Sequence, residues 1–384
     1  MQREHSDTAE QGSELVAAGS GDRLRGCFRM LFLYDVAEAI DLGHLKQLLG
    51  PRGDMQEPRF GRGTPEHIRF EAPPYIERAE PFHLPTGQIA SCSLRYYPFA
   101  VIALQLELPF EGDWRQLVKE AAQWNGSPDL EREIRALVRE HVERAALAIT
   151  RLHKQWLHES YLIVNLEPIL DLSGQAVPGQ SLLSTRPQEI AGIVWGEERA
   201  LSISETEETF RATLSYYPSD LIVISPSGAF VYDRPEEAVA ATQVLEYAKM
   251  QLLELRYYDG VMSRALTELY DALERQRSAV LSRWTLSRDA RRMNRIRLDV
   301  TELTERIDND IKFVSDVYYA RVHRLAAQRM GVSEYREMVD EKLQTARELY
   351  EFMVDQFNEA RSFILEVGIA ILALLDVIYL IRGH

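Results

Sequence analysis

The order of apolar and polar residues divides the chain into three regions. Up to about residue 234, short apolar and aromatic runs alternate with helical patterns and with loops that contain Gly and Pro. From Pro235 onward, apolar residues recur every three or four positions, and Gly and Pro become rare. The last region, Phe363 to Ile381, is apolar except for Glu366 and Asp376. This pattern predicts an α+β fold, in which an N-terminal α/β sandwich-type module precedes long heptad-patterned helices and one C-terminal transmembrane helix.

The first region predicts an α/β domain of residues 23–234, preceded by a disordered polar tail of residues 1–22. Expected strands are 25–34, two runs within 88–108, 161–166, 220–225 and 229–233. Expected helices are 37–49, 114–124, 129–157 and 205–216, and the Gly- and Pro-rich stretch 50–89 is expected to be a loop. Leu94–Pro98 is echoed by Leu214–Pro218, which leaves open whether the domain consists of two loosely repeated halves.

The second region, residues 235–362, predicts long helices that associate as hairpins or coiled coils. Apolar residues follow heptad spacing, although Asp310 interrupts the apolar seam and would set the register at some cost in stability. Ser333 follows Gly331 and is the expected N-cap of the final helix. Because no Gly or Pro breaks this helix before residue 363, it is expected to reach about 50 residues, or roughly 75 Å.

The third region, 363–381, has the length of a membrane span, since 19 helical residues rise about 28 Å. Its Leu, Ile, Val and Phe side chains favour insertion by roughly 4–8 kcal/mol, which outweighs the cost of two off-centre acids. Glu366 and Asp376 lie about 80° apart around the helix, so we expect them to make polar contacts between self-associating helices. The alternatives are a helix buried in a soluble core and an amphipathic helix lying on the membrane.

Charge and cysteine content limit the other possibilities. The net charge of −15 argues against nucleic-acid binding by the whole surface. Cys27 and Cys92 form no ligand motif and are expected to be buried free thiols in a reducing compartment. The first 21 residues lack the apolar core of a secretory signal, so we expect a single-pass C-terminal anchor with the bulk of the chain cytoplasmic.

One segment, Arg275–Arg297, is strongly basic within this acidic protein. It is a candidate site for RNA phosphates or anionic lipid head groups. The alternative is that it pairs with the protein's own acids, such as Asp299 and Glu302. The arginines expected to form this patch are Arg283, Arg288, Arg291, Arg292, Arg295 and Arg297.

No catalytic or metal-binding motif emerges from the sequence. His141, His153 and His158 fall in one stretch expected to be helical, but 153 and 158 are five positions apart, whereas metal ligands on a helix need three or four. We therefore expect a solvated helix face at these histidines. The protein is expected to be non-enzymatic, without cofactor or metal, and an enzyme in the α/β half is a less favoured alternative.

The C-terminal third, residues 240–383, resembles the family named for a requirement in meiotic nuclear division. The resemblance lies in Asp316–Tyr319, in Val339–Gln344 and in Leu365–Glu366 at the start of the apolar region. The chain departs from that family at Val367, where an aromatic residue is usual. The resemblance implies an oligomeric, non-enzymatic membrane protein.

Together these features predict a membrane-anchored homo-oligomeric scaffold or tethering protein whose partner proteins are unknown. The second hypothesis is a component of cation transport or of a channel, resembling in outline the magnesium transporters that join a cytosolic α/β domain to long helices. Those transporters have two spans and a Gly-Met-Asn loop, whereas this chain has one expected span and lacks that loop.

Overall fold

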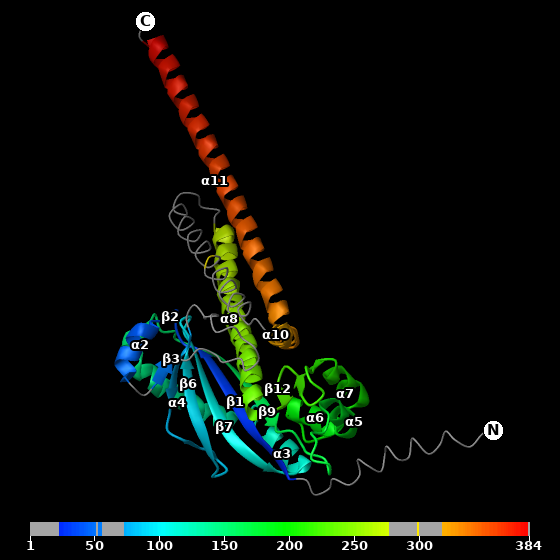
Figure 1. The fold of residues 1–384 in the computed structure, drawn as a ribbon. Helices are drawn as coiled ribbons and strands as arrows, with labels where there is room; N and C mark the ends of the chain where they lie inside the picture. Colours follow the sequence, from blue (N-terminus) through cyan, green and yellow to red (C-terminus); the bar gives the residue numbers. More distant parts are fainter. Residues whose placement is uncertain (1–22, 51–52, 56–72, 276–297, 299–316, 383–384) are drawn as a thin grey trace, which may run out of the picture. The chain divides into compact units, whose positions relative to one another are not determined.

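The computed structural model describes residues 23–50, 53–55, 73–275, 298 and 317–382 (Figure 1). The chain forms two compact units. The first comprises Met1–Glu254 and Leu303–Ser333, and the second comprises Leu255–Glu302 and Glu334–His384. The boundary after Glu254 therefore falls inside a long helix rather than in a loop.

A large mixed sheet dominates the first unit. Its described strands have the order β10-β11-β12-β9-β1-β7-β6-β4-β3, with β5 paired to β6. All of these pairs are antiparallel except β12 with β9. The strands are β1 (Leu24–Asp35), β3 (Gly53–Met55), β4 (Tyr75–Arg78), β5 (Phe82–His83), β6 (Ile89–Tyr96), β7 (Val101–Gly112), β9 (Leu157–Leu166), β10 (Thr213–Leu214), β11 (Leu221–Ile224) and β12 (Gly228–Tyr232). A separate pair is formed by β2 (Ala39–Ile40) and β8 (Ile149–Thr150).

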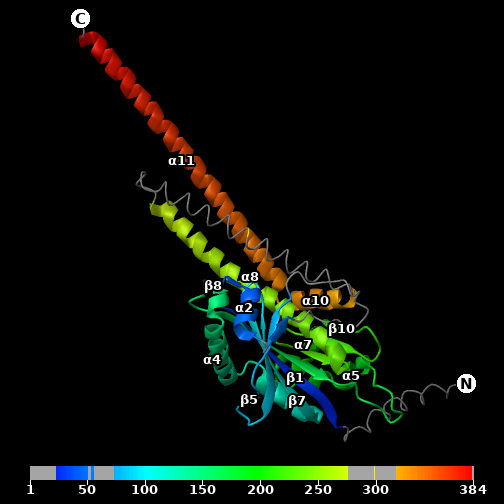
Figure 2. The same ribbon diagram turned by 60° about the vertical axis from the view of Figure 1, so that its left-hand side comes forward.

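Helices cover both faces of this sheet (Figures 1 and 2). Because side chains alternate along a strand, Phe28, Met30 and Phe32 of β1 enter the main apolar core. Residues of α2, α3, α4, α5 and α6 complete that core. The opposite face meets the first part of α8. The described helices are α2 (Leu42–Leu49), α3 (Trp114–Trp124), α4 (Pro128–Arg144), α5 (Gly179–Thr185), α6 (Pro187–Trp195), α7 (Ile203–Phe210), α8 (Pro235–Arg275), α10 (Val317–Arg329) and α11 (Val332–Arg382), with a short 3₁₀ turn at Ala146–Ala148.

Several predicted elements are confirmed, namely the strand at 25–34, the two strands within 88–108, the helix at 114–124 and the long helix that begins at Pro235. The helix predicted at 129–157 is wrong beyond Arg144. There the chain turns through Arg151, which has a positive φ of 53°, and Ile149–Thr150 pair with β2 instead. The stretch 50–89 was also predicted incorrectly, because its described part contains β3, β4 and β5. Asp41 caps α2, so that helix begins at Leu42 and not at residue 37.

The second unit contains the later part of α8 and most of α11. Lys342 donates hydrogen bonds to Asp259 and to the Oγ of Ser263, the latter at 2.7 Å. Val339 and Ala346 are buried and lie seven positions apart, as the heptad pattern predicts. The prediction of an unbroken final helix of about 50 residues is confirmed, since α11 has 51. Gly331, with a φ of 83°, stands just before it.

Arg329 fastens α10 to α7 within the first unit. One nitrogen of its guanidinium donates to the Oε1 of Glu208 at 3.0 Å, and the other donates to the Glu208 carbonyl oxygen. That carbonyl lies in the last turn of α7, where it also accepts from the Arg211 N–H at 3.2 Å. Replacing Arg329 by Ala is therefore expected to lower the free energy of unfolding by about 1–2 kcal/mol, allowing for the partial exposure of the pair. Urea denaturation checks this, and an equal loss in Arg329→Lys would show that the paired hydrogen bonds, and not the positive charge, carry the effect.

Candidate functional site

The structure describes only some of the residues that were predicted to contact partners in the C-terminal region. Glu366 is exposed on α11, and Asp376 belongs to the same helix but its side chain lies outside the described residues. The arginines of the predicted anionic-partner patch, from Arg283 to Arg297, all lie outside the described residues. The predictions that these residues contact partner helices, RNA or lipid therefore stay predictions.

Among the described helices, none combines the length and the hydropathy that a membrane span requires. The predicted span is described only in part, because no side chain from 374 to 382 is included. In its described part, the five consecutive apolar residues from Ile369 to Ala373 are all exposed.

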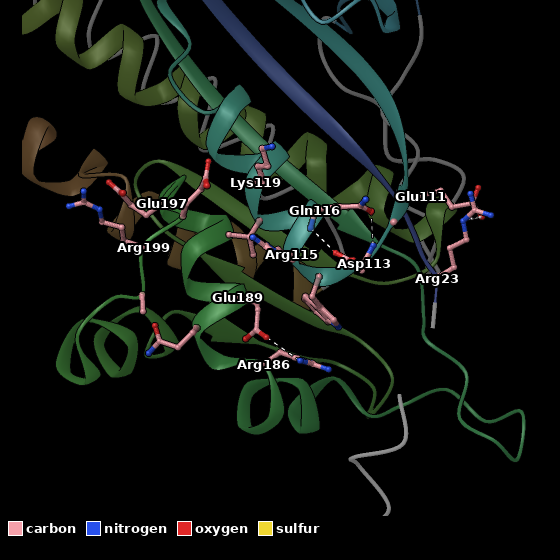
Figure 3. A pocket seen from close by; sticks show the side chains of 16 residues that line it. Arg23, Glu111, Asp113, Arg115, Gln116, Lys119, Arg186, Glu189, Glu197 and Arg199 are labelled. Atoms are coloured by element: carbon pink, nitrogen blue, oxygen red, sulfur yellow. Dashed lines mark hydrogen bonds and ion pairs between the residues drawn. The ribbon is translucent and has the colours of Figure 1, made fainter. Parts of the chain in front are cut away.

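The first unit contains a polar cleft of about 1140 Å³ (Figure 3). The end of β7, the start of α3, the start of α6 and the segment 197–200 line it. Asp113 forms a capping box with Gln116 and so fixes the first turn of α3 at the cleft. The guanidinium of Arg186 lies 5.8 Å from the ring centre of Trp114, which places one cation on the aromatic wall.

The charges of this cleft balance one another. Its basic residues are Arg23, Arg115, Lys119, Arg186 and Arg199, and its acidic residues are Glu111, Asp113, Glu189, Glu197 and Glu198. Arg186 pairs with Glu189 at 3.2 Å, and Arg23 pairs with Glu111 at 3.2 Å. The cleft therefore presents equal numbers of positive and negative groups and selects for no single charge.

A second cluster, buried in the main core, has the residue types of acid–base chemistry. The Oε2 of Glu77 accepts from the Tyr96 hydroxyl at 2.8 Å and lies 3.1 Å from the Nδ1 of His141, while its Oε1 accepts from Arg144 at 2.7 Å. Burial by itself would raise the pKa of Glu77, but hydrogen bonds from His141, Tyr96 and Arg144 outweigh burial and lower the pKa to about 2. Since its groups satisfy one another inside the core, the cluster stabilises the fold.

The prediction of a solvated face at the three histidines is wrong. His141 is buried, and its place could have been read from the sequence, because Leu130, Ile134 and Val138 precede it at spacings of four and three on α4. His153 and His158 lie outside any helix. The Nε2 of His153 lies 3.3 Å from Asp35, and the Nε2 of His158 lies 3.7 Å from Glu131.

A third group, which we call the polar band, lies between α8 and the sheet. The carboxylate of Glu246 on α8 accepts from Arg95 at 2.9 Å and from the Tyr97 hydroxyl at 2.9 Å. One helical turn later, Lys249 donates to Glu159 of β9 at 3.1 Å. The polar band comprises Arg29, Arg95, Gln105, Glu107, Glu159, Glu246 and Lys249.

Lys249, a member of the polar band, has a lowered pKa. Burial lowers the pKa of this lysine to about 8, since the charged ammonium loses its water. No spacing along the chain predicts the band, because its members come from β1, β6, β7, β9 and α8.

The described residues include no group of three or more His, Cys, Asp or Glu side chains placed to hold a metal ion. Both cysteines are free, as expected, but only Cys92 is buried as predicted, whereas Cys27 is half-buried. Burial raises the pKa of Cys27 to about 11 and that of Cys92 to about 12, so both stay protonated near neutral pH.

Comparison with known proteins relates the first unit to a domain family. The family described as "Uncharacterized protein MJ0711, N-terminal domain" matches residues 25–238, more than half of the chain. The chain belongs to the MJ0711 N-terminal domain family. The uncharacterized protein MJ0711 of Methanocaldococcus jannaschii is 23% identical over 171 residues, which are 44% of this chain and 52% of that protein. The chain thus spans about half the length of this curated relative, and no solved structure matches it.

The match to the MJ0711 N-terminal domain begins at the second residue of β1 and includes all the other described strands. It ends at Ala238, in the first turn of α8. It includes the Glu77 cluster and all of the polar cleft except Arg23. The resemblance to the family of meiotic nuclear division concerns residues 240–383, outside this match, and stays a prediction.

Proposed function

We propose that the protein is a non-enzymatic, membrane-anchored oligomeric scaffold. In this proposal the MJ0711 N-terminal domain carries the surfaces for partner proteins, and the terminal part of α11 enters the membrane and associates with other copies. The observation that carries the proposal is the exposed apolar run in that helix, Ile369 to Ala373.

The apolar run differs from an ordinary amphipathic stripe. Ile369, Ile371 and Leu372 are 65%, 52% and 64% exposed. Consecutive helical positions are about 100° apart, so five exposed apolar residues in succession surround the helix on every side. A helix that is apolar all round is stable when lipid or protein covers it.

The space around the preceding turn supports the same proposal. Among the described residues, no atom lies within 4 Å of a Cβ placed on Gly368, and Glu366 is exposed. This part of α11 therefore has room for a neighbouring helix, and glycine allows helix backbones to approach closely in membranes. In the proposed oligomer, Glu366 faces the partner helix and not lipid.

Arginine substitutions in the apolar run test the anchor. Each arginine at a membrane helix centre costs about 2.5–3.5 kcal/mol, so Ile371→Arg with Leu372→Arg costs about 5–7 kcal/mol and cancels the favourable insertion of the remaining residues. Full-length protein is expected to stay in the membrane pellet after a carbonate wash, and the double variant is expected to move to the supernatant.

The matched control places the same substitutions at exposed apolar residues of the first unit. Leu172 and Ile203 are 96% and 76% exposed, so Leu172→Arg with Ile203→Arg adds the same charge without touching α11. This control is expected to stay in the pellet. If wild-type protein is washed off, or if the Ile371 and Leu372 variant stays in the pellet, the proposed anchor is wrong.

A further inference from the structure

The connection between α4 and β9 exposes several apolar side chains at one end of the sheet. We call residues 146–157 the leucine loop, and its short strand β8 is labelled in Figure 2. Leu147 is 78% exposed, Leu152 is 54% exposed and Leu157 is 36% exposed, while Trp156 beside them is half-buried. Single exposed leucines are common on protein surfaces, but three of them in one loop with a tryptophan form a candidate interaction surface.

Backbone hydrogen bonds hold the leucine loop against the segment that follows β1. The N–H donors and carbonyl acceptors of these bonds are Asp41 to Ala148 at 2.9 Å, Glu38 to Thr150 at 3.2 Å and His153 to Val36 at 2.8 Å. Arg151 has a φ of 53°, in the left-handed region that residues other than glycine rarely adopt. The loop therefore keeps its leucines in water although its backbone is fixed in place.

The leucine loop is basic within an acidic protein. It contains no Asp or Glu, whereas Arg151 and Lys154 are both exposed. Glu38 pairs with Arg151 at 2.8 Å. On the adjoining helix α4, the guanidinium of Arg139 lies 6.0 Å from the ring centre of Trp156. Leucine, tryptophan and cations together are typical of segments that lie between the acyl chains and the anionic head groups of a bilayer.

A second pair of exposed leucines in the first unit lacks this positive charge. Leu170 and Leu172 are 59% and 96% exposed, but Asp171 lies between them, and residues 167–178 contain no Lys or Arg. This turn follows the opposite end of β9, a strand whose ten residues span roughly 30 Å. Anionic head groups are repelled by such a turn and attracted by the leucine loop, so the two exposed pairs differ in the surface that suits them.

We propose that the leucine loop docks the first unit on an anionic lipid bilayer. Leu147 and Leu152 enter the boundary between head groups and acyl chains, and Arg151 and Lys154 face the lipid phosphates. A bilayer takes up separate leucines without the matching pockets that a partner protein would need. This contact is distinct from the anchor proposed for α11, because all of its residues belong to the first unit.

Co-sedimentation with vesicles tests this surface without the proposed anchor. The full-length variant Ile371→Arg with Leu372→Arg is mixed with vesicles of phosphatidylcholine, either alone or with phosphatidylserine. It is expected to sediment with the mixed vesicles. Its affinity for them is expected to be at least about fivefold higher than for phosphatidylcholine alone, which is the contribution of one cation at an anionic surface.

Two sets of substitutions, added to that parent variant, locate the contact. Leu147→Glu with Leu152→Glu is expected to weaken binding at least about tenfold, because the leucines no longer bury apolar surface and the new carboxylates are repelled by phosphatidylserine. Lys154→Glu is expected to remove the preference for phosphatidylserine. Since all three side chains are exposed, the urea midpoint is expected to stay unchanged, which separates lost docking from lost folding.

The matched control is Leu170→Glu with Leu172→Glu, which makes the same chemical change in the turn after the opposite end of β9. This control is expected to bind vesicles as the parent does. The proposal is overturned if the parent does not sediment with the mixed vesicles, or if the Leu147 and Leu152 variant binds as tightly as the parent. Equal binding to both kinds of vesicle would overturn the role of the cations. None of these outcomes decides the carbonate test of α11, so the two proposals can fail separately.

Discussion

Replacing Glu246 by leucine is expected to lower the free energy of unfolding by about 3–5 kcal/mol. Glu246 is 1% exposed, and its carboxylate accepts from Arg95 and from the Tyr97 hydroxyl. The substitution leaves the buried Arg95 guanidinium with Gln105 as its remaining described hydrogen-bond partner. Removing one partner of a buried charge pair is strongly destabilising, and this cost exceeds what the new apolar contacts of leucine return.

Urea denaturation followed by tryptophan fluorescence measures this loss. Glu236→Leu, at an exposed position of the same helix, is the control and is expected to change the free energy of unfolding by less than about 0.5 kcal/mol. Replacing both charges, as in Arg95→Met with Glu246→Leu, is expected to recover most of the lost stability, because no buried charge then lacks a partner. A double variant no more stable than Glu246→Leu would show that the hydrogen bonds themselves, and not the charge balance, hold α8 on the sheet.

Replacing Glu77 by glutamine is expected to cost about 3 kcal/mol at pH 7. The folded pKa of about 2 lies below the ordinary value of 4.5, and each pKa unit corresponds to about 1.4 kcal/mol. Since the pKa is lowered on folding, this contribution is complete above the ordinary carboxyl pKa and is lost as the pH falls from about 4.5 toward 2.

The pH profile separates this role from simple packing. Wild-type protein is expected to lose stability over that acidic range, whereas Glu77→Gln should have a flatter profile there. Glu143→Gln, at an exposed position of α4, serves as the control with the wild-type profile. If wild type and Glu77→Gln lose stability in parallel below pH 4.5, the ionised form of Glu77 is not what stabilises the cluster.

The two buried acids Glu77 and Glu254 differ in the number of donors that reach them. Glu77 receives hydrogen bonds from three side chains, so its ionised form is favoured despite burial. Glu254 has an oxygen without a hydrogen-bond partner among the described residues, and burial and then the charge of Asp35 raise its pKa, so its neutral form is favoured. Burial is common to both, and the partners decide the direction of each pKa shift.

The sequence by itself determined the elements whose signals are local. Aromatic and large apolar residues placed β1, an alternating apolar run placed β6, and the helix expected at 114–124 is α3. Uninterrupted helical periodicity gave the length of α11. The hydropathy of the last region marked the apolar stretch on which the proposed anchor depends, because hydropathy can be read from a segment without knowing what packs against it.

Only the tertiary structure decided how distant segments meet. Arg95 and Glu246 are 151 positions apart, and Glu77 and His141 are 64 apart, so no spacing rule joins them. The strands within 50–89 were missed because they are short and gain their hydrogen bonds from other strands, β4 and β5 from β6 and β3 from β4. A buried charge is tolerated only where another element supplies its partner, and that partner is set by sheet order and helix packing rather than by neighbouring residues.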